Sequence, residues 1–143
     1  MDFACSFFVE GKPIPKGNHR AFIRGSKAIV TDTQGGNLSD WEAAIRNAAR
    51  SVFQYGVVTD RSVILELTFH FLHPKNHFTP KGKETSRFRM YHIVKPDADK
   101  LTRAVGDALT GVVYRDDSQV MYNKIKKVYD CKQGVMISIY IGE

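Results

Sequence analysis

The sequence has 143 residues, of which 43% are apolar and 25% are charged. This length and composition predict one globular domain over residues 1–143 with a core of its own. The apolar runs are far shorter than the roughly 20 residues that a membrane span needs, and the N-terminal stretch turns acidic too soon for a signal peptide. Cys5 and Cys131 are too few for a disulfide framework, so we expect a cytoplasmic protein with reduced thiols and no membrane contact.

Positive charge is concentrated in two segments, although the whole chain carries only +6. Residues 10–27 and residues 73–95 each combine five or six basic residues with a single glutamate. Such clusters suit a polyanionic partner; in the first segment, basic residues that serve only solubility are an equal alternative. The candidate phosphate contacts are Lys12, Lys16, Arg20, Arg24, Lys27, Lys75, Lys81, Lys83, Arg87, Arg89 and Lys95.

The first part of the chain predicts a strand, a hairpin and a helix, in that order. Residues 3–9 form a Phe-rich apolar run, which is followed by a loop that its prolines stiffen. The pair Gly25-Ser26 lies between two short apolar runs, which is a hairpin signal. Ser39 opens a capping-box pattern, and apolar residues then recur on one face, so we expect a helix from there to a stop near Gly56.

Residues 62–72 predict the clearest strand, because apolar and polar side chains alternate strictly. The segment 73–95 follows and has no clear period, which is typical of a functional loop. Its aromatic residues interleave with Lys and Arg, a mixture that can stack on unpaired bases and contact phosphates. His73 and His77 lie four residues apart within it, but Pro74 argues against a helix that would bring them together as zinc ligands.

An acidic stretch, residues 95–120, holds five of the ten aspartates of this otherwise basic chain. The residues before Asp99 include a proline and are expected to be extended, so that Asp97 and Asp99 point the same way. Asp99 is then the expected N-cap of a helix over residues 100–110. Residues 112–114 predict a short strand that ends at an aspartate pair.

The last part of the chain predicts a hairpin that pairs residues 119–129 with residues 135–141. Taken together, the elements predict an α/β fold of the mixed α+β kind. In this fold a small mixed β-sheet packs with two main helices.

The acidic stretch offers the groups that metal-assisted hydrolysis of a phosphodiester needs. Mg²⁺ prefers a few carboxylates together with water and substrate oxygens, and it can activate water and stabilise phosphate charge. The candidate ligands are Asp97, Asp99 and a third carboxylate from Asp117 or Asp116. A nearby cation would stabilise the developing phosphorane charge, and Arg103 is the first candidate and Lys100 the second.

A purely structural explanation of these aspartates stays open. Asp99 could serve only as a helix cap, and Asp116 and Asp117 could be turn residues. Asp107 lies four residues after Arg103, the spacing of a surface ion pair, and we take it as structural.

The stretch PDADKLTRAVGDALTGVVYRDDSQV resembles the pattern of the RusA family of Holliday-junction resolvases. The shared features are D-x-D at a helix start, D-A-L near its end, a short apolar run and then D-D-x-Q-V. The loop KPIPKGNHR is similar to the N-terminal loop of the same family.

The resemblance implies a small α/β homodimer in a bacterial or phage-infected bacterial cell, acting in DNA recombination and repair. Such an enzyme binds four-way DNA junctions and nicks two strands symmetrically with Mg²⁺, for which Mn²⁺ can substitute. Carried over by position, the metal ligands are Asp97, Asp99 and Asp117. The basic residue four positions after the second aspartate is Arg103, where some members have lysine, and Lys100 replaces an asparagine found in some relatives.

Two other functions fit the same residues. The first is a catalytically inactive protein that binds branched DNA in an architectural role. The second is a basic protein that binds single-stranded nucleic acid without preferring branched DNA.

Overall fold

The computed structural model describes residues 1–17, 19–24, 27–32, 37–53 and 59–143. Within these residues, four strands form a mixed sheet in the order β1-β6-β4-β5. The strands are β1 (Asp2–Glu10), β4 (Val63–Leu72), β5 (Val120–Asp130) and β6 (Gly134–Ile141). β6 runs antiparallel to both β1 and β4, whereas β4 and β5 are parallel. With its two main helices, this sheet confirms the predicted α+β fold.

The predicted C-terminal hairpin is wrong, because β4 lies between β5 and β6. The two strands have the expected positions in the sequence, but each pairs with β4 rather than with the other. The side chains of Val135, Ile137 and Ile139 on β6 are fully buried, whereas Lys124 and Lys126 on β5 are exposed. The observed order places the apolar strand inside the sheet and the lysine-rich strand at its edge, where charged side chains also discourage pairing with other chains.

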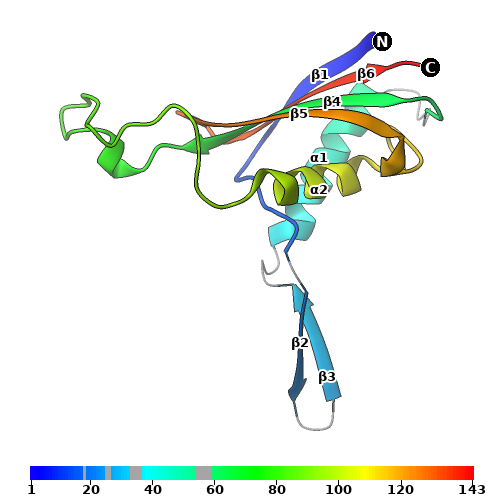
Figure 1. Cartoon of the computed structure of the whole chain (residues 1–143), viewed down its shortest axis with the longest axis horizontal. Coiled ribbons are helices and arrows are strands. Elements are labelled where there is room, and N and C mark those ends of the chain that lie inside the picture. The colour runs from blue at the N-terminus through cyan, green and yellow to red at the C-terminus, as the bar shows by residue number, and fades with distance from the viewer. Residues whose placement is uncertain (18, 25–26, 33–36, 54–58) are drawn as a thin grey trace.

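Helices α1 (Asn37–Val52) and α2 (Ala98–Leu109) lie on one face of the sheet and pack against each other (Figure 1). Their buried residues form one core with the alternating apolar side chains of β4 and β6. The predicted start of the first helix is too late, since Ser39 lies inside its first turn. The predicted stop at Gly56 lies outside the described residues. None of the helices in the described residues is long and apolar enough to cross a membrane.

The predicted N-terminal hairpin is confirmed as β2 (His19–Arg24) and β3 (Lys27–Asp32), which pair antiparallel. Its turn at Gly25-Ser26 lies outside the described residues. Figure 1 shows the hairpin running away from the sheet and the helices. The backbone of Arg20, Arg24 and Lys27 therefore lies on a projection, well placed for a large partner.

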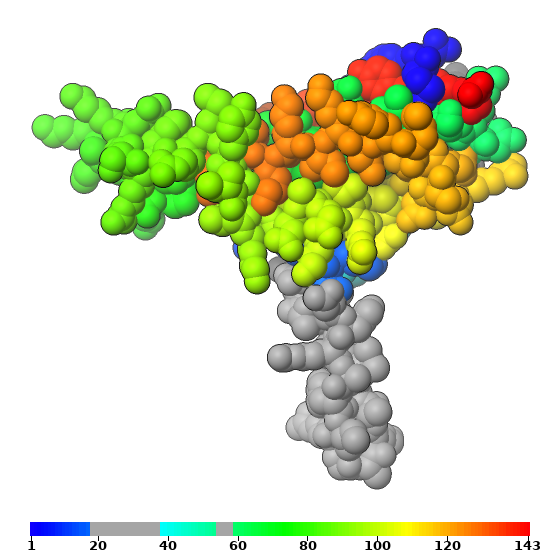
Figure 2. Space-filling model, viewed as in Figure 1, coloured from blue at the N-terminus to red at the C-terminus, as the bar shows by residue number. Residues whose placement is uncertain are grey.

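Residues 73–92 form a lobe that extends beyond the end of the sheet, drawn in green in Figure 2. The lobe opens with a short 3-10 helix, η1 (Lys75–His77), which follows Pro74. This turn brings His73 and His77 together, contrary to the sequence prediction, with 2.8 Å between their Nδ1 atoms. The His73 ring also stacks on Phe88 and Tyr129, so aromatic packing holds the lobe on β5.

Residues 112–114 form a turn rather than the predicted strand. The turn follows Gly111, which has a positive φ of 84° that suits glycine. Tyr114 is fully buried, and its hydroxyl donates a hydrogen bond of 2.9 Å to the Gly106 carbonyl in α2. A second short 3-10 helix, η2 (Asp117–Gln119), comes next, and Asp116 is its N-cap residue.

Candidate active site

Helix α2 positions the acidic stretch because its apolar face is fixed in the core. Residues at helical spacing make up this fully buried face: Leu101, Ala104, Val105, Ala108 and Leu109. Large side chains in such positions each contribute about 1.5–3 kcal/mol of burial free energy. The polar residues of α2 therefore have defined positions along its exposed side.

The helix begins earlier than the sequence predicts, so Asp97 is extended but Asp99 is helical. Asp97 is the N-cap residue, with φ −73° and ψ 146°, and Asp99 lies in the first turn. The Asp97 carbonyl accepts a hydrogen bond of 3.1 Å from the Leu101 amide, which commits the chain to helix at Ala98. The Asp97 carboxylate lies 4.0 Å from the Lys100 ammonium, so the first turn carries both acidic and basic candidates.

The two aspartates before β5 have different surroundings. The Asp116 carboxylate accepts a hydrogen bond of 2.8 Å from the Ser118 amide, and Asp116 and Gln119 form a complete capping box. The bonds to Ser118 lower the pKa of Asp116, and a shared bond with Asp117 lowers it further. The same shared bond is the main cause that raises the pKa of Asp117, with burial and the charges of Asp116 and Asp107 adding to it.

Gln119 anchors this aspartate pair to the segment that leads into β4. Its side-chain oxygen accepts from the Arg115 and Asp116 amides at 2.8 and 3.0 Å. Its side-chain nitrogen donates to the carbonyls of Thr59 and Arg61 at 3.0 and 2.9 Å. All polar atoms of the glutamine side chain thus hold the turn, which gives the last part of the D-D-x-Q-V pattern a structural reason.

Lys16 lies beside the acidic residues, which the sequence alone did not indicate. Its ammonium is 2.8 Å from the Asp107 carboxylate and 3.3 Å from that of Glu42. The hydrogen bond to Asp107 is the main cause that raises the pKa of Lys16. Lys16 and Asp107 line one hollow together with Thr110, Asp116 and Asp117.

Asp107 therefore lines the same hollow as Asp116 and Asp117. It is bound by Lys16, whereas the sequence considered a pair with Arg103. No spacing could have revealed this pair, since its two members lie far apart in the chain. The D-A-L of the motif was the one feature of the sequence that drew attention to Asp107.

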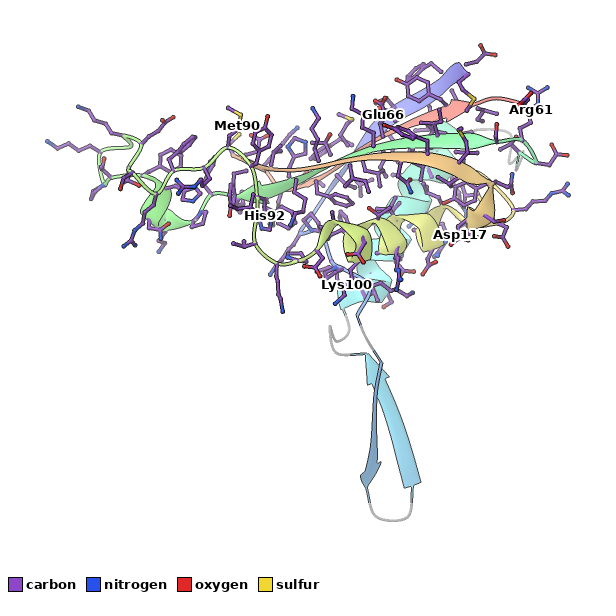
Figure 3. The ribbon with its side chains drawn as sticks, in the orientation of Figure 1. Arg61, Glu66, Met90, His92, Lys100 and Asp117 are labelled. Atoms are coloured by element: carbon purple, nitrogen blue, oxygen red, sulfur yellow. The ribbon has the colours of Figure 1, made fainter. Side chains whose placement is uncertain are left out.

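Arg103 is exposed on α2, and it lines a hollow with Asp117 and Tyr114. This position brings together the predicted catalytic cation and one of the predicted ligands. Lys100 lies near the start of the helix, away from Asp117, as Figure 3 shows. Of the two candidate cations, Arg103 is thus the one beside Asp117.

The predicted metal ligands fall into two groups along α2. Asp97 and Asp99 lie at its first turn, whereas Asp117 lies beside its second half, near Arg103 and Gly106. In the described part of the chain, no three His, Cys, Asp or Glu side chains are close enough together to hold a metal ion. The donors are nevertheless of the right kind, because a hard divalent cation prefers carboxylate oxygens and would relieve the crowding at Asp117.

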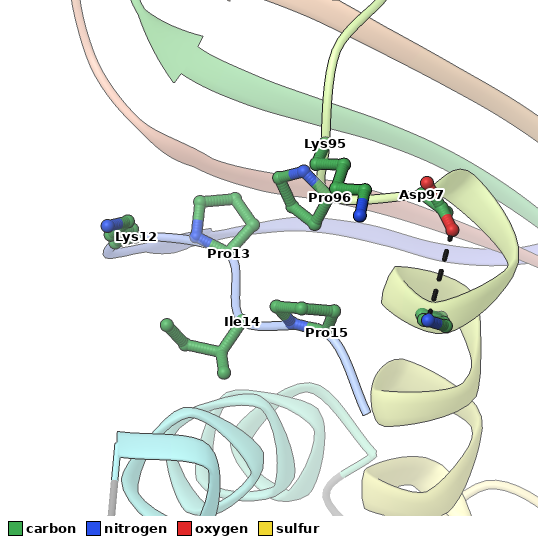
Figure 4. A pocket seen from close by; sticks show the side chains of 8 residues that line it. Lys12, Pro13, Ile14, Pro15, Lys95, Pro96 and Asp97 are labelled. Carbon is green, nitrogen blue, oxygen red and sulfur yellow. Dashed lines mark ion pairs between the residues drawn. The ribbon is translucent and has the colours of Figure 1, made fainter. Parts of the chain in front are cut away.

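Apart from Lys16, which pairs with Asp107 and Glu42, the predicted phosphate contacts fall into three places. Lys12 and Lys95 flank a hollow at the start of α2 (Figure 4). The lobe carries exposed lysines and arginines: Lys75, Lys81, Lys83, Arg87 and Arg89. The side chains of Arg20, Arg24 and Lys27 lie outside the described residues.

Comparison with known proteins identifies similar sequences. The model of the family described as "Endodeoxyribonuclease RusA" matches residues 10–140. The chain is also similar to a Bacillus subtilis (strain 168) protein named "Uncharacterized protein YqaN". The two are 27% identical over 135 residues, which cover 93% of each chain.

Proposed function

Since the chain belongs to the RusA endodeoxyribonuclease family, we propose that it is a Mg²⁺-dependent enzyme that resolves four-way DNA junctions by paired, symmetric nicks. The family implies Holliday-junction resolvase activity on branched DNA. The family match over most of the chain is the observation that carries the proposal. Positive charge on the hairpin, the lobe and the start of α2 supports it, because phosphate contacts dominate binding to DNA.

Asp117 is the metal ligand that we propose with the best support. Its carboxylate, unlike that of Asp116, is not committed to capping a helix. Its pKa is raised by the hydrogen bond that it shares with Asp116, by burial and by the charges of Asp116 and Asp107, and a cation would offset these charges. Asp97 and Asp99 are the other proposed ligands, and gathering them with Asp117 requires movement of these side chains. A bound Mg²⁺ would activate water and stabilise charge on the phosphate.

The remaining side chains have separate proposed roles. Arg103, beside Asp117, stabilises the charge that develops on the phosphate. Lys16 holds Asp107 in place and offsets its charge. A homodimer presents two such sites related by a two-fold axis, which suits the symmetry of a four-way junction.

A junction-binding protein without activity is the alternative. The test measures nicking of a labelled synthetic four-way junction and of a linear duplex, with Mg²⁺ or with chelator. The proteins compared are wild type, Asp99→Asn and a control, Asp60→Asn, at an exposed position. We expect paired nicks on the junction with Mg²⁺ for wild type and control, and binding without nicking for Asp99→Asn. Tight junction binding by wild type with no nicks under any condition would establish the alternative.

A further inference from the structure

A hollow of about 390 Å³ lies at the start of α2, between the loop after β1 and the segment that leads into the helix (Figure 4). Its volume lies within the range of about 300–1,000 Å³ that is usual for small-ligand sites. The side chains of Pro13, Ile14, Pro15 and Pro96 make its apolar lining. Charged side chains make up the rest of the lining, so this hollow suits a ligand that is partly apolar and partly anionic.

Both walls of the hollow are held in place by bonds within the chain. The Lys127 ammonium donates to the carbonyls of Val94 and Pro96 at 2.8 and 2.7 Å, and the Lys127 carbonyl accepts from the His92 amide at 3.0 Å. On the opposite wall, the Lys16 amide donates to the Lys100 carbonyl at 2.9 Å. The prolines restrict the backbone further. The hollow is therefore preformed, which lowers the entropic cost of binding.

The charges around the hollow favour a phosphate-bearing ligand. Lys12, Lys95 and Lys100 surround it, and Asp97 is the one acidic residue of its lining. The Asp97 charge is partly offset by Lys100, 4.0 Å away. The lining thus combines a net positive rim with a proline-rich floor.

We propose that this hollow receives one nucleotide of the DNA strand, with its base against the prolines and Ile14 and its phosphates on the lysine rim. The inference rests on the proposed function, because it assumes a DNA substrate. Turning a base out of a stack costs least where pairing is already disturbed, as at the centre of a junction. The nucleotide would lie next to Asp97 and Asp99, so its identity would influence where the enzyme cleaves.

The experiment measures junction affinity by fluorescence anisotropy, in chelator so that nothing is cleaved. Junctions carry a single abasic site at each position near the exchange point in turn. We expect one position, repeated by symmetry, at which loss of the base weakens binding by wild type about fivefold or more, equivalent to the contribution of about 1 kcal/mol from a stacked base.

The matched variants test whether the hollow causes that loss. Filling it with Ile14→Trp, or removing its rim charge with Lys12→Ala/Lys95→Ala, should abolish the position-dependent loss. The control Lys81→Ala/Lys83→Ala, which removes the same charge from the lobe, should weaken all junctions and keep the loss. Circular dichroism shows whether each pocket variant folds. If one of them misfolds, the other still tests the hollow.

Two outcomes would overturn the inference: no abasic position weakens binding, or the position-dependent loss persists in the folded pocket variants. Cleavage of the intact junction in Mg²⁺ is measured in parallel. Cleavage without a position-dependent loss refutes the hollow and keeps the proposed function. A position-dependent loss without cleavage refutes the enzyme and keeps the nucleotide site.

Discussion

Replacement of Asp116 and Asp117 one at a time should separate a capping carboxylate from a metal-binding one. Asp116→Asn keeps an acceptor oxygen for the Ser118 amide, and asparagine is as good an N-cap residue as aspartate. This variant should therefore fold and cleave like wild type. Asp117→Asn removes the carboxylate that lies beside Arg103, and it should abolish cleavage while junction binding in chelator persists.

The magnitudes follow from the contacts. Asp116→Ala loses the cap, which costs about 1 kcal/mol of unfolding free energy, or about 2–4 °C in melting temperature for a chain near this size. Asp117→Asn should not destabilise the fold, because the amide can still donate a hydrogen bond to Asp116 and no longer carries the negative charge that Asp116 and Asp107 disfavour. Its cleavage rate should fall at least about 100-fold, since loss of even a group that supports a ligand costs 10–100-fold.

The assay combines thermal unfolding with single-turnover nicking of a four-way junction at saturating Mg²⁺. Asp116→Asn is the internal control for the amide substitution. If Asp116→Asn loses cleavage as severely as Asp117→Asn, Asp116 is more than a cap. Full cleavage by Asp117→Asn would refute its assignment as a ligand.

Four further outcomes are expected. Lys127→Met should lower the unfolding free energy in urea by about 1–3 kcal/mol, because two carbonyls lose a charged donor; a smaller loss would mean that water replaces the ammonium. Burial lowers the pKa of His92, so the unfolded chain binds the extra proton and stability should fall as pH drops below about 6.5; urea unfolding across this range should show a shallower fall for His92→Phe. Lys81→Ala and Lys83→Ala should each reduce the slope of log affinity against log salt by about one, and an unchanged slope would place the lobe off the DNA. Asp107→Asn should leave cleavage within about tenfold of wild type if Asp107 only pairs with Lys16, whereas a loss as large as that of Asp117→Asn in the nicking assay would make it a ligand.

The sequence predicted the elements well where a pattern depends on one face of one segment. Strict alternation identified β4, and the apolar spacing of α2 identified its buried face. Pairing between strands was less predictable, because it depends on how all strands share the core. β5 and β6 are neighbours in the chain, which favoured a hairpin, but β6 is apolar enough to be central and β5 is not.

The candidate site shows the same limit. The motif located Asp117 and Arg103, which the fold brings near each other. It did not reveal that Asp116 acts as a cap, because both aspartates are suitable cap residues and the backbone angles decide which of them caps. Nor did it reveal that Lys16 binds Asp107, because this contact joins the loop after β1 to the far end of α2.

The position of the metal along α2 decides how cleavage relates to the nucleotide hollow. A helix rises about 1.5 Å per residue, so Asp97 and Asp107 are separated by about 15 Å along the axis, and one ion cannot bind both. If the ion is held at the start of α2, with Asp117 moving toward Asp97 and Asp99, the cleaved phosphate borders the nucleotide in the hollow. If it is held at Asp107 and Asp117, the cleaved phosphate lies farther along the strand. Asp107→Asn and the abasic series together therefore locate the ion. If Asp107→Asn still cleaves, the sensitive abasic position should be adjacent to the nick. If Asp107→Asn does not cleave, the sensitive abasic position should lie farther from the nick.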